Sequence, residues 1–275
     1  MDFKAVVLDL DGVIYRGNAV IPGSADAIAD LQRAGKKVRF LTNNATKTSE
    51  EYSEKLFRMG IKAEPSHILT SGIATAIYIR KSLGFHKAYV VGSRSLRSEM
   101  AEEGVRLTEW DDAEVVVTSL DQEFTYQKLF DAMKAVRRGC PLVATNMDPV
   151  VPDENGFVPG AGSITSAVEV ASGATATYVG KPSSLILQIA GTTWGLDKAS
   201  TCIVGDRLDT DMAAGNSFGW RPILVLSGST GPSDLLIKMP DLSKPSATYQ
   251  DLAEFVSAEL GTGQVQRKKA VTDQR

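Results

Sequence analysis

The sequence predicts an α/β fold with a largely parallel sheet. Short apolar runs rich in Val and Ile alternate with amphipathic stretches along most of the chain, and strand–helix alternation of this kind is typical of parallel sheets. Hydrophobic residues make up 43% and charged residues 23% of the 275 residues, which is a globular composition. A chain of this length can form one large domain or two ordinary ones.

The candidate strands are short apolar runs rich in β-branched side chains. In chain order they are Ala5–Leu10, Val38–Thr42, Ala88–Val91, Glu114–Thr118, Leu142–Thr145, Thr175–Val179, Thr201–Val204 and Ile223–Leu226. Four of these runs lead into polar segments that could carry chemistry. Ligands of open α/β sheets gather outside the carboxyl ends of the strands, so these segments are candidates for one shared site.

The candidate helices are the amphipathic stretches between these strands. They are Ser24–Ala34, Ser49–Met59, Ser71–Leu83, Ser93–Glu103, Thr125–Arg137, Ile164–Ala171, Ser183–Gly195, Thr210–Gly215 and Gln250–Leu260. Thr48 followed by Glu51 predicts a capping box before the second helix. Glycines stand where four of the helices should stop, at Gly35, Gly60, Gly139 and Gly195.

Charge and composition exclude several classes of partner. A formal net charge of −3 predicts no broad surface for a nucleic-acid polymer. No apolar run approaches the ~20 residues of a membrane span, and the N-terminal segment lacks the pattern of a signal peptide.

Cys140 and Cys202 form neither a C-x-x-C motif nor a disulfide framework, which predicts a reduced, cytoplasmic protein. His67 and His86 are expected to be surface or loop residues, so carboxylates, lysine or a metal would carry any catalysis.

Two carboxylates lie at the end of the first predicted strand in "DLDG", Asp9 to Gly12. Strand residues two positions apart point the same way, so Asp9 and Asp11 would face one pocket if the strand geometry continues that far. The pair is equally well explained as a helix- or turn-capping pair before Gly12. Two acids in one pocket would require a cation, a proton or a catalytic role.

The strand Val38–Thr42 leads into "LTNN", which supplies the Thr42 hydroxyl and then Asn43 and Asn44 with exposed backbone N–H groups. Hydroxyl and N–H donors suit phosphate oxygens. Taken alone, the segment is more typical of a polar loop in which Asn adopts a left-handed turn.

Lys181 follows the strand Thr175–Val179 in "VGKPSS" and precedes Pro182, a residue that can occupy the first turn of a helix. A helix beginning there would direct its positive end the same way as the ammonium, which makes a good anion site. The alternative is an ordinary surface lysine at a helix start.

Three acids lie within six residues after the strand Thr201–Val204, namely Asp206, Asp209 and Asp211. Acids after a buried strand are costly unless a cation offsets them, and oxygen-only ligands indicate a hard ion such as Mg²⁺. The alternative is enrichment of Asp at a helix N-terminus, where the helix dipole favours negative charge. We assign this capping role to Asp209 or Asp211 and the ligand role to Asp206.

Together the four segments supply paired acids, an anion cradle, a lysine and a cation-binding acid. Transfer of a phosphoryl group needs these components. One carboxylate attacks phosphorus and another moves protons, while Mg²⁺ and lysine offset the phosphate charge.

With these residues in this order, the chain resembles the haloacid dehalogenase superfamily of phosphohydrolases. The segments "DLDGV", "LTNN", "GKPS" and "GDRLDTD" resemble the four motifs of that superfamily, and the resemblance covers residues 5 to about 260. More narrowly, "LTNNATKT", "ATNMDPVVP" and "VGKPS" paired with "VGDRLDTD" are similar to the NagD-type and p-nitrophenyl phosphatase branch.

The resemblance implies a Rossmann-like core with a second α/β cap domain inserted between Thr42 and Lys181. About 138 residues separate these two positions, which is room for such a cap. We expect the core at 1–79 and 179–261, the cap at 80–178, and a flexible tail at 262–275. The family commonly dimerises, so the resemblance also implies a homodimer, with the cap as its expected interface.

The resemblance also implies a role for each catalytic residue. Asp9 matches the nucleophile that forms an aspartyl-phosphate, and Asp11 matches the acid/base that protonates the leaving alcohol and then activates water. Thr42 and the Asn43 backbone match the phosphate-binding position. Lys181 matches the lysine that steadies the nucleophile and the phosphate.

The implied cofactor is Mg²⁺. The resemblance assigns Asp206 as its main ligand, alongside the Asp9 side chain and the Asp11 main-chain carbonyl. Asp211 matches an acid that supports the metal shell through water, and Asp209 has no role in the family pattern.

The expected function is Mg²⁺-dependent hydrolysis of a small phosphorylated metabolite. Candidate substrates are a sugar phosphate, a nucleoside monophosphate, phosphoglycolate or pyridoxal phosphate. The alternatives are a phosphomutase or phosphotransferase, which would share Asp9 and Asp11, and a non-catalytic metabolite-binding protein. Dehalogenation is disfavoured, because Asp11 suits an ester leaving group that needs a proton and a halide does not.

Overall fold

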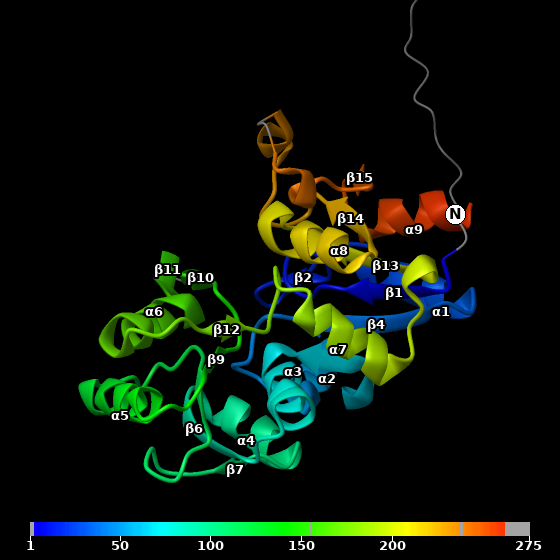
Figure 1. Cartoon of the computed structure of the whole chain (residues 1–275). Helices are drawn as coiled ribbons and strands as arrows, with labels where there is room; N and C mark the ends of the chain where they lie inside the picture. The colour runs from blue at the N-terminus through cyan, green and yellow to red at the C-terminus, as the bar shows by residue number, and fades with distance from the viewer. Residues whose placement is uncertain (1–2, 154–155, 237–238, 262–275) are drawn as a thin grey trace, which may run out of the picture.

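The core of the protein is a six-stranded parallel sheet, described here from a computed structural model of residues 3–153, 156–236 and 239–261 (Figure 1). Its strands are β1 (Ala5–Leu8), β4 (Lys37–Thr42), β5 (Ile68–Thr70), β13 (Thr201–Gly205), β14 (Arg221–Val225) and β15 (Ala247–Tyr249). In space they run β15-β14-β13-β1-β4-β5, and each neighbouring pair is parallel. The carboxyl ends of β1, β4 and β13 therefore meet at one edge of the sheet.

The chain builds a second parallel sheet, the cap, between β5 and β13. Its strands are β6 (Lys87–Val91), β7 (Arg106–Leu107), β8 (Val115–Thr118), β9 (Leu142–Ala144) and β12 (Thr177–Tyr178). They run in the order β12-β9-β8-β6-β7, and a hairpin of β10 (Val150–Asp153) and β11 (Gly156–Pro159) follows β9. This architecture confirms the α/β fold with a Rossmann-like core and an inserted α/β cap.

Helices cover both faces of each sheet (Figure 1). In the core, α1 (Ser24–Arg33), α2 (Ser49–Arg58) and α9 (Leu252–Leu260) pack on one face. On the other core face lie α3 (Ser71–Ile77), α7 (Leu185–Trp194) and α8 (Ala213–Phe218). In the cap, α5 (Tyr126–Arg137) and α6 (Ala161–Ser172) cover one face and α4 (Arg94–Glu102) covers the other.

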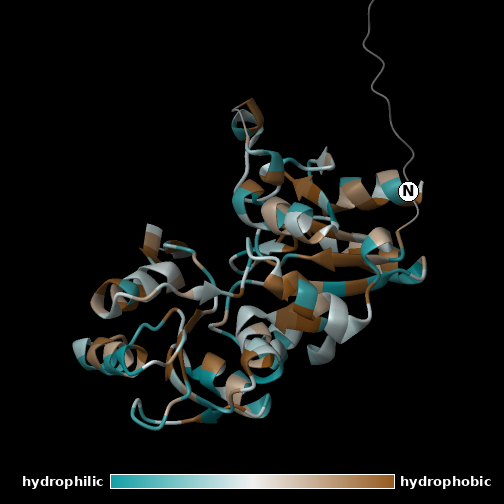
Figure 2. Ribbon diagram, in the orientation of Figure 1, coloured by the Kyte–Doolittle hydropathy of each residue, from teal (hydrophilic) through white to brown (hydrophobic). Residues whose placement is uncertain are grey.

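The hydrophobic packing follows the alternation of side chains along the strands. In β1, Val6 and Leu8 join the cluster with α1 and α9, whereas Val7 joins the cluster with α7. A strand covered on both faces must be apolar throughout, and the central core strands are accordingly brown in Figure 2. The cluster around Val7 continues into the cap through Leu96 and Val90, so this apolar packing holds the cap on the core.

Several helix boundaries follow the sequence signals. The Thr48 hydroxyl accepts a hydrogen bond from the Glu51 N–H, and the Glu51 carboxylate accepts one from the Thr48 N–H, which confirms the capping box. The four glycines at predicted helix ends all have positive φ, namely Gly35, Gly60, Gly139 and Gly195. Glycine adopts this conformation without the steric cost that a Cβ would bring.

The shortest elements depart from the prediction. β1 ends at Leu8, two residues before the predicted end at Leu10. The sequence does not predict β5, β7, β15, the β10–β11 hairpin or a second hairpin of β2 (Tyr15–Arg16) and β3 (Ala19–Val20). Runs of two to four residues carry too little periodicity to be recognised.

We propose the domain limits that the sequence predicts, with the core at 1–79 and 179–261 and the cap at 80–178. Support comes from the elements that flank the two places where the chain passes between core and cap. β5 ends at Thr70 and β6 begins at Lys87, whereas β12 ends at Tyr178 and α7 begins at Leu185. The predicted tail at 262–275 lies outside the described residues.

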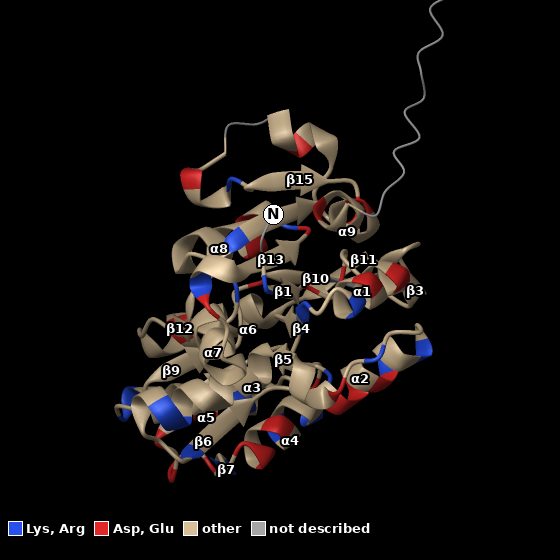
Figure 3. Ribbon diagram, turned by 90° about the vertical axis from the view of Figure 1, so that its right-hand side faces the viewer, with Lys and Arg blue, Asp and Glu red and all other residues tan. Residues whose placement is uncertain are grey.

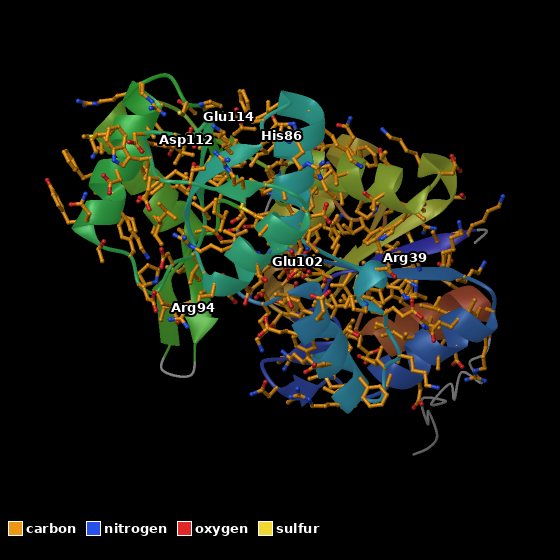
Figure 4. The ribbon with its side chains drawn as sticks, turned by 90° about the horizontal axis from the view of Figure 1, so that it is seen from below. Arg39, His86, Arg94, Glu102, Asp112 and Glu114 are labelled. Atoms are coloured by element: carbon orange, nitrogen blue, oxygen red, sulfur yellow. The ribbon has the colours of Figure 1, made fainter. Side chains whose placement is uncertain are left out.

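Acidic and basic residues are interspersed along the chain, for example in α2 and α4 (Figure 3). Cys140 and Cys202 are both free thiols. His67 lies in a short 3-10 helix, and His86 is exposed on the cap near Asp112 and Glu114 (Figure 4), which confirms surface or loop positions for both. Across the described ranges, no helix has both the length and the apolar character needed to cross a membrane.

Candidate active site

Polar residues from the four predicted segments meet at the carboxyl edge of the core sheet. Asp9 directly follows β1, Thr42 is the last residue of β4, and Asp206 directly follows β13. Lys181 lies in the turn before α7, and its Nζ is 2.8 Å from Asp9 Oδ1. The structure therefore brings segments from both ends of the chain into one site.

Lys181 is a buried ammonium held between two carboxylates. Its Nζ lies 2.6 Å from Asp211 Oδ1 as well as 2.8 Å from Asp9 Oδ1. Lys181 is 2% exposed and Asp211 is fully buried. Burial alone would lower the pKa of the ammonium, but Asp211 and Asp9 raise it above its ordinary value. Lys181 is therefore charged at physiological pH.

Three carboxylates in this site outnumber the single lysine. One oxygen from each of Asp9, Asp206 and Asp211 lies within 4.8 Å of the other two. Burial, aided by the neighbouring acids, raises the pKa of Asp9 to about 7 and that of Asp206 to about 6. Lys181 opposes both shifts without cancelling them. An excess of buried carboxylate oxygens is a fitting environment for a hard divalent cation.

Glycines allow the backbone to approach the Asp206 carboxylate closely. A Cβ at Gly12 would lie 2.4 Å from Asp206 Oδ2, and a Cβ at Gly228 would lie 2.1 Å from the same atom. The Ser229 N–H donates to that oxygen at 2.5 Å. The segment Ser227–Thr230 after β14 was missed by sequence reasoning, although "SGST" follows the end of a strand just as the recognised segments do.

Asp11 is outside the carboxylate cluster. Because β1 ends at Leu8, strand alternation no longer fixes the direction of the Asp11 side chain, which is exposed. Neighbouring protein atoms still displace part of the water around the carboxyl, and this desolvation raises the pKa of Asp11, while Lys55 and the Gly17 backbone lower it. Asp11 therefore keeps its proton to a higher pH than an ordinary aspartate, which suits a group that donates a proton.

Thr42 and Asn43 lie at the end of β4. The Thr42 hydroxyl is nearly buried and accepts a hydrogen bond from the Asn44 N–H at 3.1 Å. The Asn43 amide pairs with the Lys181 backbone: Nδ2 donates to Lys181 O, and Oδ1 accepts from Lys181 N, both at 2.8 Å. The Asn43 side chain thus fixes the backbone of Lys181, a role that sequence reasoning did not identify.

The helix-capping alternatives account for only part of what is observed. Asp211 Oδ2 accepts from the Arg207 N–H at 3.2 Å, at the start of a π-helical turn at Leu208–Met212, but its other oxygen pairs with Lys181. Asp209 instead forms an ion pair with the Arg207 guanidinium at 2.9 Å. The predicted helix after Lys181 begins only at Leu185, so Pro182 precedes α7 and does not lie in its first turn.

Comparisons with known proteins show the family to which the chain belongs. Residues 6–106 match the model of the haloacid dehalogenase-like hydrolases, and residues 178–255 match a second, HAD-hydrolase-like model. An acid sugar phosphatase from Staphylococcus haemolyticus is 37% identical over 256 residues, which are 93% of this chain and 96% of that protein. The chain belongs to the haloacid dehalogenase-like hydrolases.

Solved structures of this family superpose on nearly the whole chain. A p-nitrophenyl phosphatase from Archaeoglobus fulgidus matches with a TM-score of 0.89 and 32% identity, covering 94% of this chain and all of that one. A glycerol phosphate phosphatase from Mycobacterium tuberculosis, in complex with calcium, matches with a TM-score of 0.84 and 29% identity, covering 92% of this chain and 74% of that one.

The protein is therefore a phosphatase of the NagD-type and p-nitrophenyl phosphatase branch, which confirms the resemblance seen in the sequence. The cluster of Asp9, Asp206 and Asp211 is typical of the divalent metal site of haloacid dehalogenase-like hydrolases.

Proposed function

We propose that this phosphatase is a Mg²⁺-dependent phosphomonoesterase that hydrolyses a small phosphorylated metabolite through an aspartyl-phosphate on Asp9. The observation that carries the proposal is the buried ammonium of Lys181 between Asp9 and Asp211. This arrangement fixes the position of the Asp9 carboxylate and places beside it a positive charge that can bind the oxygens of a phosphate group.

Mg²⁺ is the cation that we propose for the carboxylate cluster. Asp9, Asp206 and the Asp11 main-chain carbonyl would hold it, with Asp211 supporting the metal shell through water. When bound, Mg²⁺ offsets the negative charge of the phosphate and of the carboxylates. The raised pKa of Asp9 and of Asp206 supports this assignment, because both groups lack sufficient positive charge around them.

The proposed reaction consists of two successive displacements at phosphorus. The Asp9 carboxylate attacks phosphorus, the bond to the ester oxygen breaks, and Asp11 gives its proton to the departing alcohol. Asp11 then takes a proton from water as the water oxygen attacks the aspartyl-phosphate, which releases phosphate and restores Asp9. The Thr42 hydroxyl and the Asn43 backbone N–H would hold the phosphate oxygens during both steps.

A compact phosphate monoester is the proposed substrate. The related proteins are named as acid sugar, p-nitrophenyl and glycerol phosphate phosphatases, which supports a sugar or polyol phosphate. A nucleoside monophosphate, phosphoglycolate and pyridoxal phosphate stay in the candidate set. A cytoplasmic location and a homodimer through the cap also stay predictions.

Release of inorganic phosphate from a panel of phosphorylated metabolites, with and without Mg²⁺, tests the proposal. We expect phosphate and free alcohol in equal amounts, only when Mg²⁺ is present. Formation of an isomeric phosphate without free phosphate would instead identify a phosphomutase. Full activity after thorough treatment with EDTA would reject the metal requirement.

A further inference from the structure

A loop of the cap, Asn146–Asp148, reaches across to the core beside the active site. It follows β9 and belongs to the segment "ATNMDPVVP", to which the catalytic scheme gives no role. Asn146 Nδ2 donates to the Asn43 carbonyl at 2.8 Å. The Asp148 carboxylate accepts from Asn43 Nδ2 at 3.3 Å and from Arg207 Nη1 at 2.7 Å. One carboxylate of the cap thus contacts two separate core segments.

The loop holds Asp148 firmly in this position. The Asp148 N–H donates to Asn146 Oδ1 at 3.1 Å, and the Asp148 carbonyl accepts from the Gly162 N–H at 2.9 Å. A Cβ at Gly160 would lie 2.3 Å from the Asp148 carbonyl oxygen, so the start of α6 can approach the loop only with glycine there. Asp148 is 8% exposed, and its geometry is set by the cap rather than by solvent.

The first contact of Asp148 leads to Lys181. The Asn43 amide that donates to Asp148 also binds both the N–H and the carbonyl of Lys181, each at 2.8 Å. The ammonium of the Lys181 side chain in turn forms ion pairs with Asp9 and Asp211. The orientation of the Asn43 amide therefore connects the cap carboxylate to the lysine.

The second contact of Asp148 leads to Asp211. Arg207 Nε and Nη2 donate to the two carboxylate oxygens of Asp209 at 3.1 and 2.9 Å. The Asp209 side chain is 71% exposed, so this ion pair holds the guanidinium only weakly. The buried Asp148 is the stronger anchor for the same guanidinium. The Arg207 backbone N–H donates to Asp211 Oδ2 at 3.2 Å. The position of Arg207 therefore helps to fix the orientation of the Asp211 carboxylate, which pairs with Lys181.

We propose that Asp148 is a positioning residue that sets the geometry of Lys181 and Asp211 through Asn43 and Arg207. The proposal rests on the proposed function, since Lys181 and Asp211 act there. Asp148 belongs to the cap and its two partners belong to the core. The contacts therefore form only when the cap is seated on the core, and the seated cap completes the catalytic arrangement.

The test compares Asp148→Asn with the matched control Asp121→Asn. Both variants neutralise a buried cap carboxylate that forms an ion pair, since Asp121 is 6% exposed and lies 2.8 Å from Lys128 Nζ. The Asp121 carboxylate also accepts a backbone N–H two residues on, from Glu123 at 2.9 Å. In the described residues, its hydrogen bonds and ion pair all lie within the cap.

Two readouts are measured for the full chain. With p-nitrophenyl phosphate, Asp148→Asn should lower kcat roughly 10- to 100-fold, with KM changing less than about threefold, because misplaced groups slow the chemical step. Asp121→Asn should stay within about twofold of the unmodified enzyme. Backbone hydrogen exchange should accelerate in peptides that contain Lys181 or Arg207 for Asp148→Asn, and stay unchanged for Asp121→Asn.

Equal kcat and equal exchange in the two variants would overturn the proposal. Faster exchange at Lys181 in an enzyme that releases no phosphate from any substrate would reject the proposed function and leave the positioning role supported. If Asp148→Asn does not fold, Arg207→Gln breaks the same ion pair by changing its other member, whose side chain is the more exposed of the two. The same loss of kcat and faster exchange at Lys181 are then expected, and their absence overturns the proposal.

Discussion

The core sheet and the cap sheet are both parallel, and both end in polar side chains, yet the two ends differ in charge. At the cap end the hydroxyls satisfy each other: Thr118 pairs with Thr165 and Thr145 with Ser119, both at 2.8 Å. At the core end, three carboxylates cluster together, and two of them, Asp9 and Asp211, pair with Lys181. The cap end is electrically balanced, whereas the core end has an excess of negative charge.

This difference distinguishes a structural polar cluster from a reactive one. Buried polar groups that satisfy one another cost the fold little and bind nothing further. Buried carboxylates without enough positive charge have a raised pKa and favour binding of a cation. The carboxylate cluster, in which burial raises the pKa of Asp9 to about 7, therefore favours the core end as the place of the proposed chemistry.

The largest expected effect comes from Asp9→Asn. The amide has nearly the same shape but lacks the attacking oxyanion, so phosphate release should fall by roughly 10⁴-fold or more. Steady-state rates, with circular dichroism to confirm folding, make the measurement. Substantial turnover by this variant would remove the functional distinction between the two sheet ends.

The second effect concerns the cation. Asp206→Asn should raise the Mg²⁺ concentration needed for half-maximal activity by roughly 100-fold, because a charged ligand is replaced by a neutral one. Titration of the EDTA-treated enzyme with Mg²⁺ measures this shift, and Asp209→Asn is the control in the same segment. An identical Mg²⁺ requirement in both variants would rule out Asp206 as a ligand.

The third effect is a dependence of stability on pH. Burial raises the pKa of Asp9 and of Asp206 above the ordinary 3.8, to about 7 and about 6. Between about pH 4 and about pH 7 these two groups therefore bind more protons in the folded protein than in the unfolded chain, so their contribution to the free energy of unfolding falls as the pH rises. Saturating Mg²⁺ favours the ionised carboxylates and should flatten this slope.

Urea denaturation at about pH 5 and about pH 7.5, in EDTA and in Mg²⁺, checks the expectation. Burial also raises the pKa of Glu99, to about 8, with the same sign. Glu99 lies outside the carboxylate cluster, where its carboxylate accepts from Ser49 N and Thr70 Oγ1, so its contribution should be equal in both conditions. A slope that Mg²⁺ does not change would contradict the account.

The smallest effect is expected at the cap end. Thr118→Val removes one hydroxyl of a neutral pair, and Thr165 still donates to the Ala161 carbonyl at 2.8 Å. Stability should fall by about 1 kcal/mol, with kcat within about twofold of the unmodified enzyme. Urea denaturation and steady-state kinetics measure both values. A large loss of kcat would show that the Thr118–Thr165 pair also takes part in the reaction.

The strand–helix order and the four polar segments could be predicted from the sequence because each depends on local pattern. Runs of Val and Ile mark the central strands, and polar residues directly after them mark the carboxyl edge of the sheet. The sequence could not show that β1 stops at Leu8, because apolar Leu10 prolongs the pattern. It also did not predict that Asp211 pairs with Lys181, because that contact spans 30 residues.

Contacts between distant segments account for what the sequence does not predict. Asp148 and Arg207 are 59 residues apart and carry no local signal of their ion pair. The pairing of the Asn43 amide with the Lys181 backbone spans 138 residues. Ser229 binds Asp206 because the loop after β14 folds back over the site. Such contacts depend on how the sheet and the cap are assembled, which single segments do not encode.

The stereochemical course at phosphorus is the measurement that tests the central claim most directly. Each in-line displacement inverts the configuration at phosphorus, so attack by Asp9 followed by attack by water restores it. Hydrolysis of a phosphorothioate monoester made chiral by sulfur and oxygen isotopes at phosphorus, in water carrying the remaining oxygen isotope and with Mg²⁺ present, should therefore yield inorganic thiophosphate with retained configuration. Inversion would show that water attacks the substrate directly and would contradict an aspartyl-phosphate on Asp9.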